Sequence, residues 1–342
     1  MQSNPCFVSA FGDSGGRSLV SQTPTSPTPL TPTPTFPKLF IKQNLNSTKR
    51  KLKPSTKAAA KQAKIDPSPS SEGPTMTYTV NCSILLTELP LLERPAAAKA
   101  AGFDAVEFWW PFATSVPTDK ETTEFETAIK NAGVQLTGLN FNAGNMPGGD
   151  RGLVSWKGRC SEFKDNIDVV AGIGERLGCK AFNALYGNRQ DEFTPEEQDE
   201  LAAKNLAAAA EGIARIGGTV LLEPVSGAPK YPLLTAEDAL KVIARVKAES
   251  GAQNIKLLAD FYHLAVNGDD VESVIENHAK DFGHIQIADN PGRGAPGTGT
   301  LPLGEWIARS RELGYDGYIG LEYKEPQESA FSWAIRQRAN AN

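Results

Sequence analysis

Four side chains with oxygen donors close or follow short apolar segments, and their types suit proton transfer and cation binding. They are Glu223 in TVLLEP, Asp260 in KLLADFYH, Gln286 in HIQIAD and Glu322 in YIGLEYK. A charge at the end of a buried strand is costly unless a partner offsets it. Converging carboxylate and amide oxygens can hold a divalent cation, and two glutamates beside it can serve as acid and base. The pattern therefore predicts one catalytic centre.

Each of these side chains needs a strand to position it, and strand-like and helix-like segments alternate from Met76 onward. Eight segments have strand character: 77–83, 104–110, 134–141, 180–186, 218–224, 255–261, 283–289 and 317–323. The helical patterns among them are 93–102, 121–133, 159–178, 195–217, 236–250 and 303–314, and several close on glycine. Eight strand–helix units in about 265 residues predict a (β/α)8 TIM barrel over residues 76–342.

The barrel also explains where the polar residues fall, because catalytic groups in this fold lie at the C-terminal ends of the strands. The competing interpretation is a doubly wound parallel sheet, but no glycine-rich nucleotide-binding fingerprint follows any strand-like segment. The third strand-like segment leads into NFNAGNMPGGDRG, a polar, glycine-rich loop that can close over a small ligand.

Residues 1–75 have a different composition from the rest of the chain. They contain a Ser/Thr/Pro tract at 21–38 and a basic stretch at 42–64. Such segments have little apolar surface to bury and predict a disordered N-terminal tail. The tail loosely resembles an organelle transit peptide, but its prolines oppose the amphipathic helix that such peptides form. Met76 as the natural first residue is the other interpretation.

Charge and cysteine content exclude several classes of function. The formal net charge of −5 divides into about +7 for residues 1–75 and about −12 for the remainder, which argues against nucleic acid as a partner. No apolar run approaches the roughly 18 residues that span a bilayer. The four cysteines form no C-x-x-C pair, which argues against structural zinc and a disulfide scaffold. We expect a cytoplasmic protein acting on a small molecule, with a homo-oligomer left open.

Six motifs occur in an order that resembles one enzyme family. They are VEFWWPF, PGGDRG, LLEPVSG, ADFYHLAVNGDD, HIQIADNPGR and GYIGLEYK, spread over 77–335. Together they resemble hydroxypyruvate isomerase, within the xylose isomerase-like TIM barrel superfamily. The resemblance implies interconversion of hydroxypyruvate and 2-hydroxy-3-oxopropanoate (tartronate semialdehyde), with Glu223 and Glu322 as an acid/base pair. We expect their two strands, the fifth and eighth, to lie on opposite sides of the ring.

The resemblance also implies a divalent metal site. Related sugar epimerases use Glu, Asp, His and Glu as ligands, which correspond to Glu223, Asp260, Gln286 and Glu322, and the glutamine matches the isomerase branch. A ligand set of oxygens with one neutral amide favours Mg²⁺ or Mn²⁺ over Zn²⁺. Moving a carbonyl along a carbon chain requires loss of a proton from the neighbouring carbon, which gives an enediolate that a cation stabilises.

Four further side chains are candidates for substrate contact. His263 resembles the substrate-binding histidine of the superfamily, and Arg293 can grip a carboxylate with two hydrogen bonds. Lys324 shares a strand face with Glu322, and Glu107 precedes the FWWPF segment. For Lys324 and Glu107 a salt bridge is the competing interpretation.

Other residues near these motifs have structural interpretations or bear on specificity. Trp109 and Trp110 are expected to wall the pocket. His284, two residues before Gln286, is expected in a deeper layer of the barrel. Thr300 stands where family members often carry glutamate, which predicts a difference in substrate preference.

Three alternative functions follow from the same sequence. A 2-oxo-tetronate isomerase or a ketose 3-epimerase of the superfamily would share the site, and substrate profiling separates them. A DNA-repair endonuclease on the same barrel would need many histidines to bind several zinc ions, whereas the chain has three. The third alternative is a non-catalytic binding barrel, and an inactive Glu322→Gln protein with an unchanged fold would argue against it.

Overall fold

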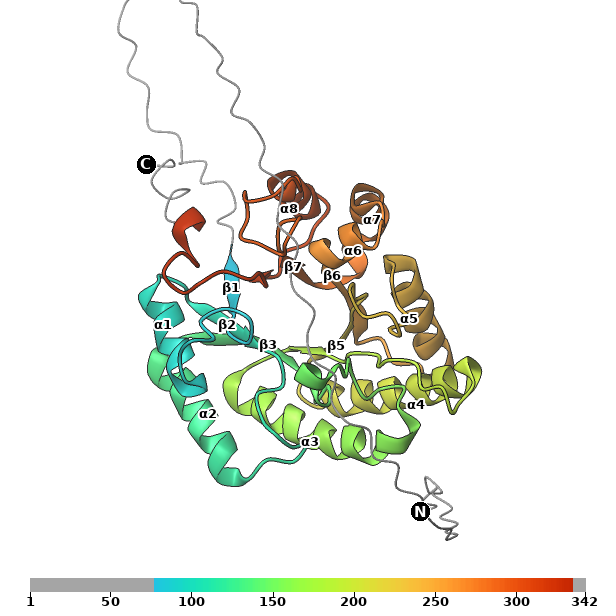
Figure 1. The fold of residues 1–342 in the computed structure, drawn as a ribbon. Coiled ribbons are helices and arrows are strands. Elements are labelled where there is room, and N and C mark those ends of the chain that lie inside the picture. The colour runs from blue at the N-terminus through green and yellow to red at the C-terminus, as the bar shows by residue number, and fades with distance from the viewer. Residues whose placement is uncertain (1–76, 335–342) are drawn as a thin grey trace, which may run out of the picture. The chain divides into compact units, whose positions relative to one another are not determined.

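The computed structural model describes residues 77–334, which form a closed barrel of eight parallel strands (Figure 1). Each strand pairs with the next in sequence, and β8 pairs with β1 to close the ring. The strands are β1 (Tyr78–Asn81), β2 (Ala105–Phe108), β3 (Gln135–Asn140), β4 (Ala181–Asn183), β5 (Thr219–Leu222), β6 (Ile255–Asp260), β7 (Phe282–Ile287) and β8 (Ile319–Leu321). The predicted TIM barrel is confirmed, whereas the tail predicted for 1–75 lies outside the described residues.

Helices follow the strands and cover the outside of the barrel (Figure 1). They are α1 (Arg94–Ala100), α2 (Asp119–Ala132), α3 (Cys160–Leu177), α4 (Pro195–Ala214), α5 (Ala236–Ser250), α6 (Phe261–Val266), α7 (Val271–His278) and α8 (Leu303–Glu312). Four 3-10 turns join them: η1 (Leu91–Glu93), η2 (Met146–Gly148), η3 (Lys157–Arg159) and η4 (Ala279–Asp281). The helical ranges taken from the sequence did not include α6, whose six residues are too few to show a clear apolar period.

The helices begin and end where local sequence signals place them. Three of them, α2, α4 and α5, start with a threonine whose hydroxyl and the acid three residues later form a capping box. Gly133, Gly178 and Gly251 adopt left-handed backbone conformations at the ends of α2, α3 and α5. These caps provide hydrogen bonds for backbone groups at the helix ends that have no partner within the helix. They also set where each helix stops and the connection to the next strand begins.

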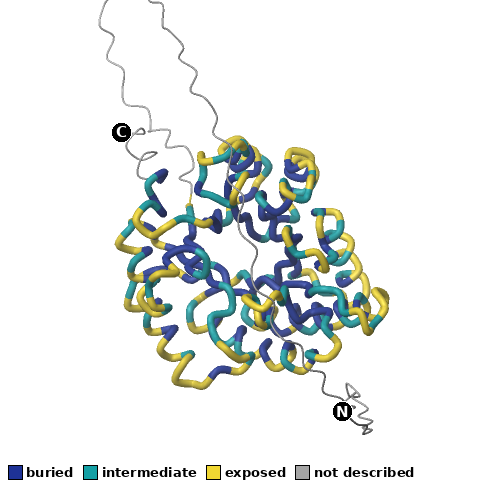
Figure 2. The backbone as a smooth tube through the Cα atoms, in the orientation of Figure 1, coloured by how far each residue is buried: buried dark blue, intermediate teal, exposed yellow. Residues whose placement is uncertain are grey.

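The core lies between the strands and the inward faces of the helices, as the buried stretches of Figure 2 show. Aromatic pairs fill much of this layer: Phe108–Phe125, Phe141–Phe163 and Phe261–Trp306, with ring centroids 5.1, 5.4 and 5.7 Å apart. Cys82, Cys160 and Cys179 are buried and form no disulfide within the described residues. No helix in 77–334 has both the length and the apolar character to cross a bilayer. The packed layer gives the strand ends a rigid support.

Gly172 and Gly174 of α3 provide a matched test of this packing. A methyl group at Gly174 would lie 2.4 Å from a ring carbon of Phe182, whereas one at Gly172 would meet only the end of the Arg176 side chain, at 2.9 Å. Overpacking a core costs about 1–3 kcal/mol, so Gly174→Ala should lower the free energy of unfolding by that amount. Gly172→Ala should leave it unchanged or raise it by up to about 1 kcal/mol, because alanine favours helix. Urea unfolding followed by circular dichroism measures both, and equal effects would contradict the packing described.

Candidate active site

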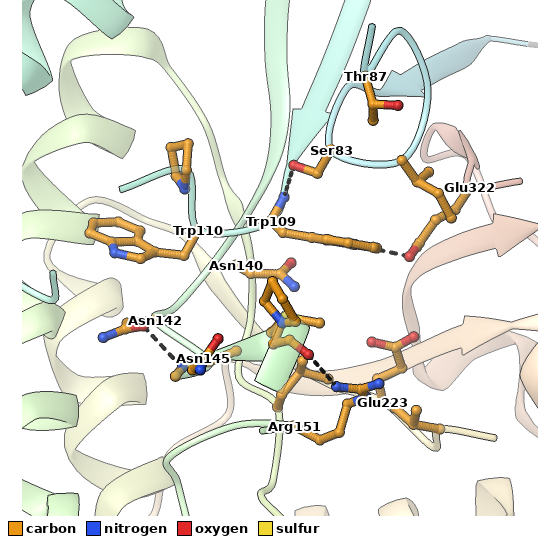
Figure 3. A pocket seen from close by; sticks show the side chains of 18 of the residues that line it. Ser83, Thr87, Trp109, Trp110, Asn140, Asn142, Asn145, Arg151, Glu223 and Glu322 are labelled. Atoms are coloured by element: carbon orange, nitrogen blue, oxygen red, sulfur yellow. Dashed lines mark hydrogen bonds between the residues drawn. The ribbon is translucent and has the colours of Figure 1, made fainter. Parts of the chain in front are cut away.

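A cavity of about 1060 Å³ opens at the C-terminal ends of the strands (Figure 3). Its lining includes Glu223, His263, Arg293, Glu322 and Lys324, which the sequence had indicated as site residues. The expected aromatic wall is also present, because Trp109 and Trp110 line the cavity. Asp260, Gln286 and Glu107 do not line it.

Glu223 follows β5 directly and is almost fully buried. Its Oε2 accepts a hydrogen bond from Asn183 Nδ2 at 2.7 Å, and its backbone carbonyl accepts one from the hydroxyl of Tyr231 at 2.9 Å. Burial first, and then the nearby Asp260 carboxylate, raise the pKa of Glu223 to about 8. A raised pKa means that this carboxylate lacks a positive partner strong enough to hold its charge.

Asp260 is the last residue of β6 and also caps α6. Its Oδ1 accepts hydrogen bonds from the backbone N–H groups of Tyr262 (2.9 Å) and His263 (3.3 Å). Its Oδ2 points elsewhere, 3.5 Å from Arg293 Nη2. The first oxygen therefore caps the helix, and the second is directed to the site.

His263 presents a neutral N–H to the carboxylates. Its Nδ1 accepts a hydrogen bond from the backbone N–H of Ser226 at 3.0 Å, so the ring proton must lie on Nε2. Nε2 is 3.8 Å from Glu223 Oε1 and 3.6 Å from Asp260 Oδ2. Burial lowers the pKa of His263 to about 4, which keeps the ring neutral at pH 7.

The proton on Nε2 of His263 limits how Glu223, Asp260 and His263 can bind a cation. Potential ligand atoms of Glu223, Asp260 and His263 lie within 4.8 Å of one another. A nitrogen that carries a proton cannot ligate a metal. His263 is therefore a hydrogen-bond donor here, which agrees with the substrate contact expected from the sequence better than with a metal ligand.

Glu322 follows β8 and is joined to the cluster through Arg293. Arg293 Nη2 donates to Glu322 Oε1 at 2.8 Å and lies 3.5 Å from Asp260 Oδ2. Trp109 Nε1 donates to the same Glu322 oxygen at 3.1 Å, reaching across the pocket in Figure 3. Burial raises the pKa of Glu322 well above its usual value even though Arg293 opposes the shift. Burial likewise opposes the charge of Arg293, but Glu322, Asp260 and Glu223 raise its pKa.

Glu107 and Gln286 lie together inside the barrel, where they border a much smaller cavity. Glu107 Oε1 accepts from Gln286 Nε2 at 2.7 Å, and Glu107 Oε2 accepts from His284 Nε2 at 2.6 Å. An ionised carboxylate only accepts, so the NH₂ of Gln286 must face it and Oε1 must face away. That Oε1 is buried and has no hydrogen-bond partner.

These contacts correct the sequence-based prediction for Glu107. It was a candidate for substrate contact, with a salt bridge as the competing interpretation, and its contact with His284 agrees with the salt bridge. β2 directs its side chain into the barrel, where it is 3% exposed and accepts from three buried donors, on Asn81, Gln286 and His284. The predicted deeper position of His284 agrees with its contact to Glu107. Lys324 lies exposed on the cavity lining, and its backbone N–H donates to the carbonyl of Arg293. Thr300 does not line the cavity and bonds instead to the carbonyl of Asn290.

The strand order also corrects one geometric expectation. In the closed ring β5 and β8 are three steps apart, one short of diametrically opposite. Figure 3 shows Glu223 and Glu322 projecting into one pocket. Their carboxylates therefore converge on one region of the cavity rather than facing each other across its full width.

Several lining residues were missed by sequence reasoning. Arg151, Asn140 and Asn142 come from β3 and the loop that follows it (Figure 3). The loop itself had been singled out for its glycines, but its arginine had not. Arg151 Nη1 donates to the carbonyl oxygens of Met146 (3.0 Å) and Asp150 (2.7 Å), which fixes this cation at the cavity.

The residues present fit a divalent cation in chemistry and in charge. Arg293 contacts two of the three carboxylates, Asp260 and Glu322, and the histidine beside Glu223 is neutral. The unpartnered Oε1 of Gln286 is a further oxygen donor. The deficit of positive charge and the unused oxygen are what a Mg²⁺ or Mn²⁺ site requires.

Replacing Glu107 tests the interior network. A glutamine at this position replaces one acceptor oxygen by an NH₂ group, so either a buried donor is left unpaired or His284 must move its proton from Nε2 to Nδ1. Glu107→Gln should therefore lower the free energy of unfolding by about 1–3 kcal/mol. Glu237→Gln, at an exposed helix position, is the matched control and should change it little. Urea unfolding of both variants checks this, and a Glu107→Gln protein as stable as the parent would refute the network.

Comparison with known proteins gives matches across the barrel. A family model described as xylose isomerase-like TIM barrel matches residues 95–339. A Streptomyces coelicolor protein provisionally named hydroxypyruvate isomerase is 54% identical over 263 residues, which are 75% of this chain and 94% of that protein. The hydroxypyruvate isomerase of Escherichia coli is 30% identical over 263 residues, 75% of this chain and 98% of its own. A Brucella melitensis structure described as AP endonuclease, family 2, matches 77% of this chain and 99% of its own at 28% identity, with a TM-score of 0.69.

Proposed function

Because the chain belongs to the xylose isomerase-like TIM barrel family, we propose that it is an isomerase that interconverts hydroxypyruvate and 2-hydroxy-3-oxopropanoate. The observation that carries the proposal is the pair of buried glutamates, Glu223 and Glu322, in one cavity. The names of the relatives support the substrate. The cytoplasmic location and any homo-oligomer stay predictions.

The reaction requires one proton to leave and one to arrive on neighbouring carbons. Removal of a proton from C3 of hydroxypyruvate gives an enediolate across C2 and C3. Protonation at C2, with the hydroxyl proton moving to the other oxygen, gives the aldehyde isomer. One glutamate acts as the base and the other as the acid, a role that suits carboxyl groups with raised pKa values.

The remaining polar groups support binding of a small anion. Arginine can hold a carboxylate with two hydrogen bonds. Among the described residues, the cavity lining has five cationic side chains: Arg94, Arg151, Arg159, Arg293 and Lys324. The Nε2–H of His263 is a neutral donor for a substrate oxygen that gains negative charge. Trp109 covers Glu322 from the cavity side and limits its contact with water.

The same arrangement supports a metal-assisted reaction. Glu223, Asp260, Gln286 and Glu322 would hold Mg²⁺ or Mn²⁺, which would stabilise negative charge on the enediolate oxygens. His263 and the arginines would then orient the substrate.

A nuclease activity has less support. The described residues contain one group of three metal-ligand side chains, Glu223, Asp260 and His263, and the histidine is a donor in it. This group lacks the several histidines of a multi-zinc site. The similarity to the Brucella melitensis structure therefore supports the shared fold rather than nuclease chemistry.

An assay of the full chain tests the proposed substrate. We expect turnover of hydroxypyruvate to exceed that of 2-oxo-tetronate and of ketoses such as ribulose, measured by NMR of the products with each at the same concentration. Abasic-site DNA serves as the nuclease control and should stay intact. A clear preference for 2-oxo-tetronate or for epimerisation of a ketose would assign the chain to that alternative activity instead.

Substitution of the two glutamates tests the chemistry. Glutamine keeps the size and one oxygen but removes the base, so Glu223→Gln and Glu322→Gln should each lower kcat by about 10²–10⁴-fold. The double variant should lose much less than the product of the two, because both groups serve one proton-transfer sequence. Glu237→Gln is the control with unchanged kcat. Near-normal turnover by either single variant would rule out the pair.

Metal removal tests the cation separately. Chelation followed by gel filtration should abolish most of the activity, and Mg²⁺ or Mn²⁺ should restore it. Elemental analysis of the stripped protein verifies removal. Full activity in protein shown to be metal-free would rule out a metal-dependent mechanism. It would not contradict the acid/base roles of the two glutamates.

A further inference from the structure

We propose that Arg293 competes with the divalent cation for the same two carboxylate oxygens, so that cation binding displaces its guanidinium toward the cavity. The proposal rests on the metal-assisted form of the proposed function. The resemblance does not assign this role to Arg293. In the metal-free protein, its guanidinium would occupy the position of the metal.

The contacts of Arg293 define the competition. Its Nη2 donates to Glu322 Oε1 at 2.8 Å and lies 3.5 Å from Asp260 Oδ2. The other oxygen of Asp260 is occupied by two backbone N–H groups, so Oδ2 is the oxygen that remains for a metal. The guanidinium therefore engages the oxygen that the cation needs from Asp260.

Close approach of both cations is unfavourable in this buried setting. Metal–oxygen distances for Mg²⁺ or Ca²⁺ are about 2.0–2.6 Å, which would put the ion within a few ångströms of Nη2 if both kept the same ligands. Asp260 is fully buried and the side chain of Arg293 is 16% exposed, so little water screens the repulsion. This repulsion favours loss of the Arg293 contacts when the metal binds.

The arginine is anchored by bonds that do not use the carboxylates. Arg293 Nε donates to the backbone carbonyl of Glu322 at 3.2 Å, and the carbonyl of Arg293 accepts from the N–H of Lys324 at 2.7 Å. The guanidinium carbon lies 5.5 Å from the centre of the Tyr262 ring. Arg293 also holds a left-handed backbone conformation, with φ of 57°. The backbone contacts hold the residue at the site, whereas the bond from Nε to the Glu322 carbonyl breaks when the planar guanidinium moves.

Displacement would couple the two binding events. A guanidinium released from Asp260 and Glu322 still lines the cavity, where it can bind the carboxylate of the substrate. The metal would thus prepare the anion site, and the apparent metal affinity of the free protein would be lowered by the cost of moving Arg293. Coupled equilibria of this kind change affinity by about 5–150-fold.

Calorimetric titration of Mn²⁺ into the metal-stripped full chain, without substrate, tests the competition. Arg293→Met removes the charge and keeps much of the volume, and it should bind Mn²⁺ at least about 10-fold more tightly than the parent. Arg151→Met removes another cavity cation, one bonded to carbonyls, and should stay within about threefold of the parent. Circular dichroism verifies folding, and Arg293→Gln replaces the methionine variant if that variant does not fold.

A second measurement separates competition from a general change in charge. Arg293→Ala leaves space for free methylguanidinium, which at millimolar concentration and constant ionic strength should weaken Mn²⁺ binding. The same additive should have no effect on Arg293→Met, whose side chain fills that space.

The outcomes distinguish this proposal from the proposed function. Unchanged or weaker Mn²⁺ binding by Arg293→Met overturns the competition, and so does equal tightening by Arg151→Met. Absence of Mn²⁺ binding in every variant overturns it as well. In each of these cases the hydroxypyruvate assay still decides the isomerase activity independently.

Discussion

The site is organised by buried negative charge that its own cations only partly balance. Glu223, Asp260 and Glu322 lie at the ends of three strands and have almost no exposure, and one guanidinium contacts two of them. Burying charges is costly unless partners offset them, and here burial raises the pKa values of both glutamates. The barrel tolerates this because its packed strands cannot rearrange to expose the carboxylates. The unsatisfied charge is what makes proton transfer and cation binding at one place chemically reasonable.

Hydrogen bonds from neighbouring residues set the orientation of several polar groups of the site. Glu107 turns the amide of Gln286, and the end of α6 holds one oxygen of Asp260. The backbone N–H of Ser226 fixes the tautomer of His263, although Ser226 itself reaches the cavity edge. The chemistry of the site therefore depends on hydrogen bonds from strand interiors and helix ends, which keep the donors and acceptors from exchanging roles.

Much of the architecture could be predicted from the sequence, because strand-like and helix-like apolar patterns alternate along it and glycines mark the helix ends. The strand-end residues Glu223, Asp260 and Glu322 were found for the same reason: polar residues closing apolar runs are conspicuous. The pattern could not distinguish a side chain that lines the cavity from one a layer deeper, so Glu107 was given a substrate contact. It also could not reveal that Arg293 bridges two acids or that Arg151 enters the cavity, since both depend on loop conformations.

The central claim is that two glutamates move protons through an enediolate, rather than a hydride passing directly between the carbons. Conversion of hydroxypyruvate in D₂O, followed by proton and deuterium NMR of the 2-hydroxy-3-oxopropanoate formed at low conversion, tests this most directly. Because the acid that protonates C2 exchanges with solvent, the account predicts deuterium at C2 of the product. Product that carries the original C3 hydrogen at C2, with no deuterium, would contradict the account, because separate base and acid groups cannot return the same hydrogen.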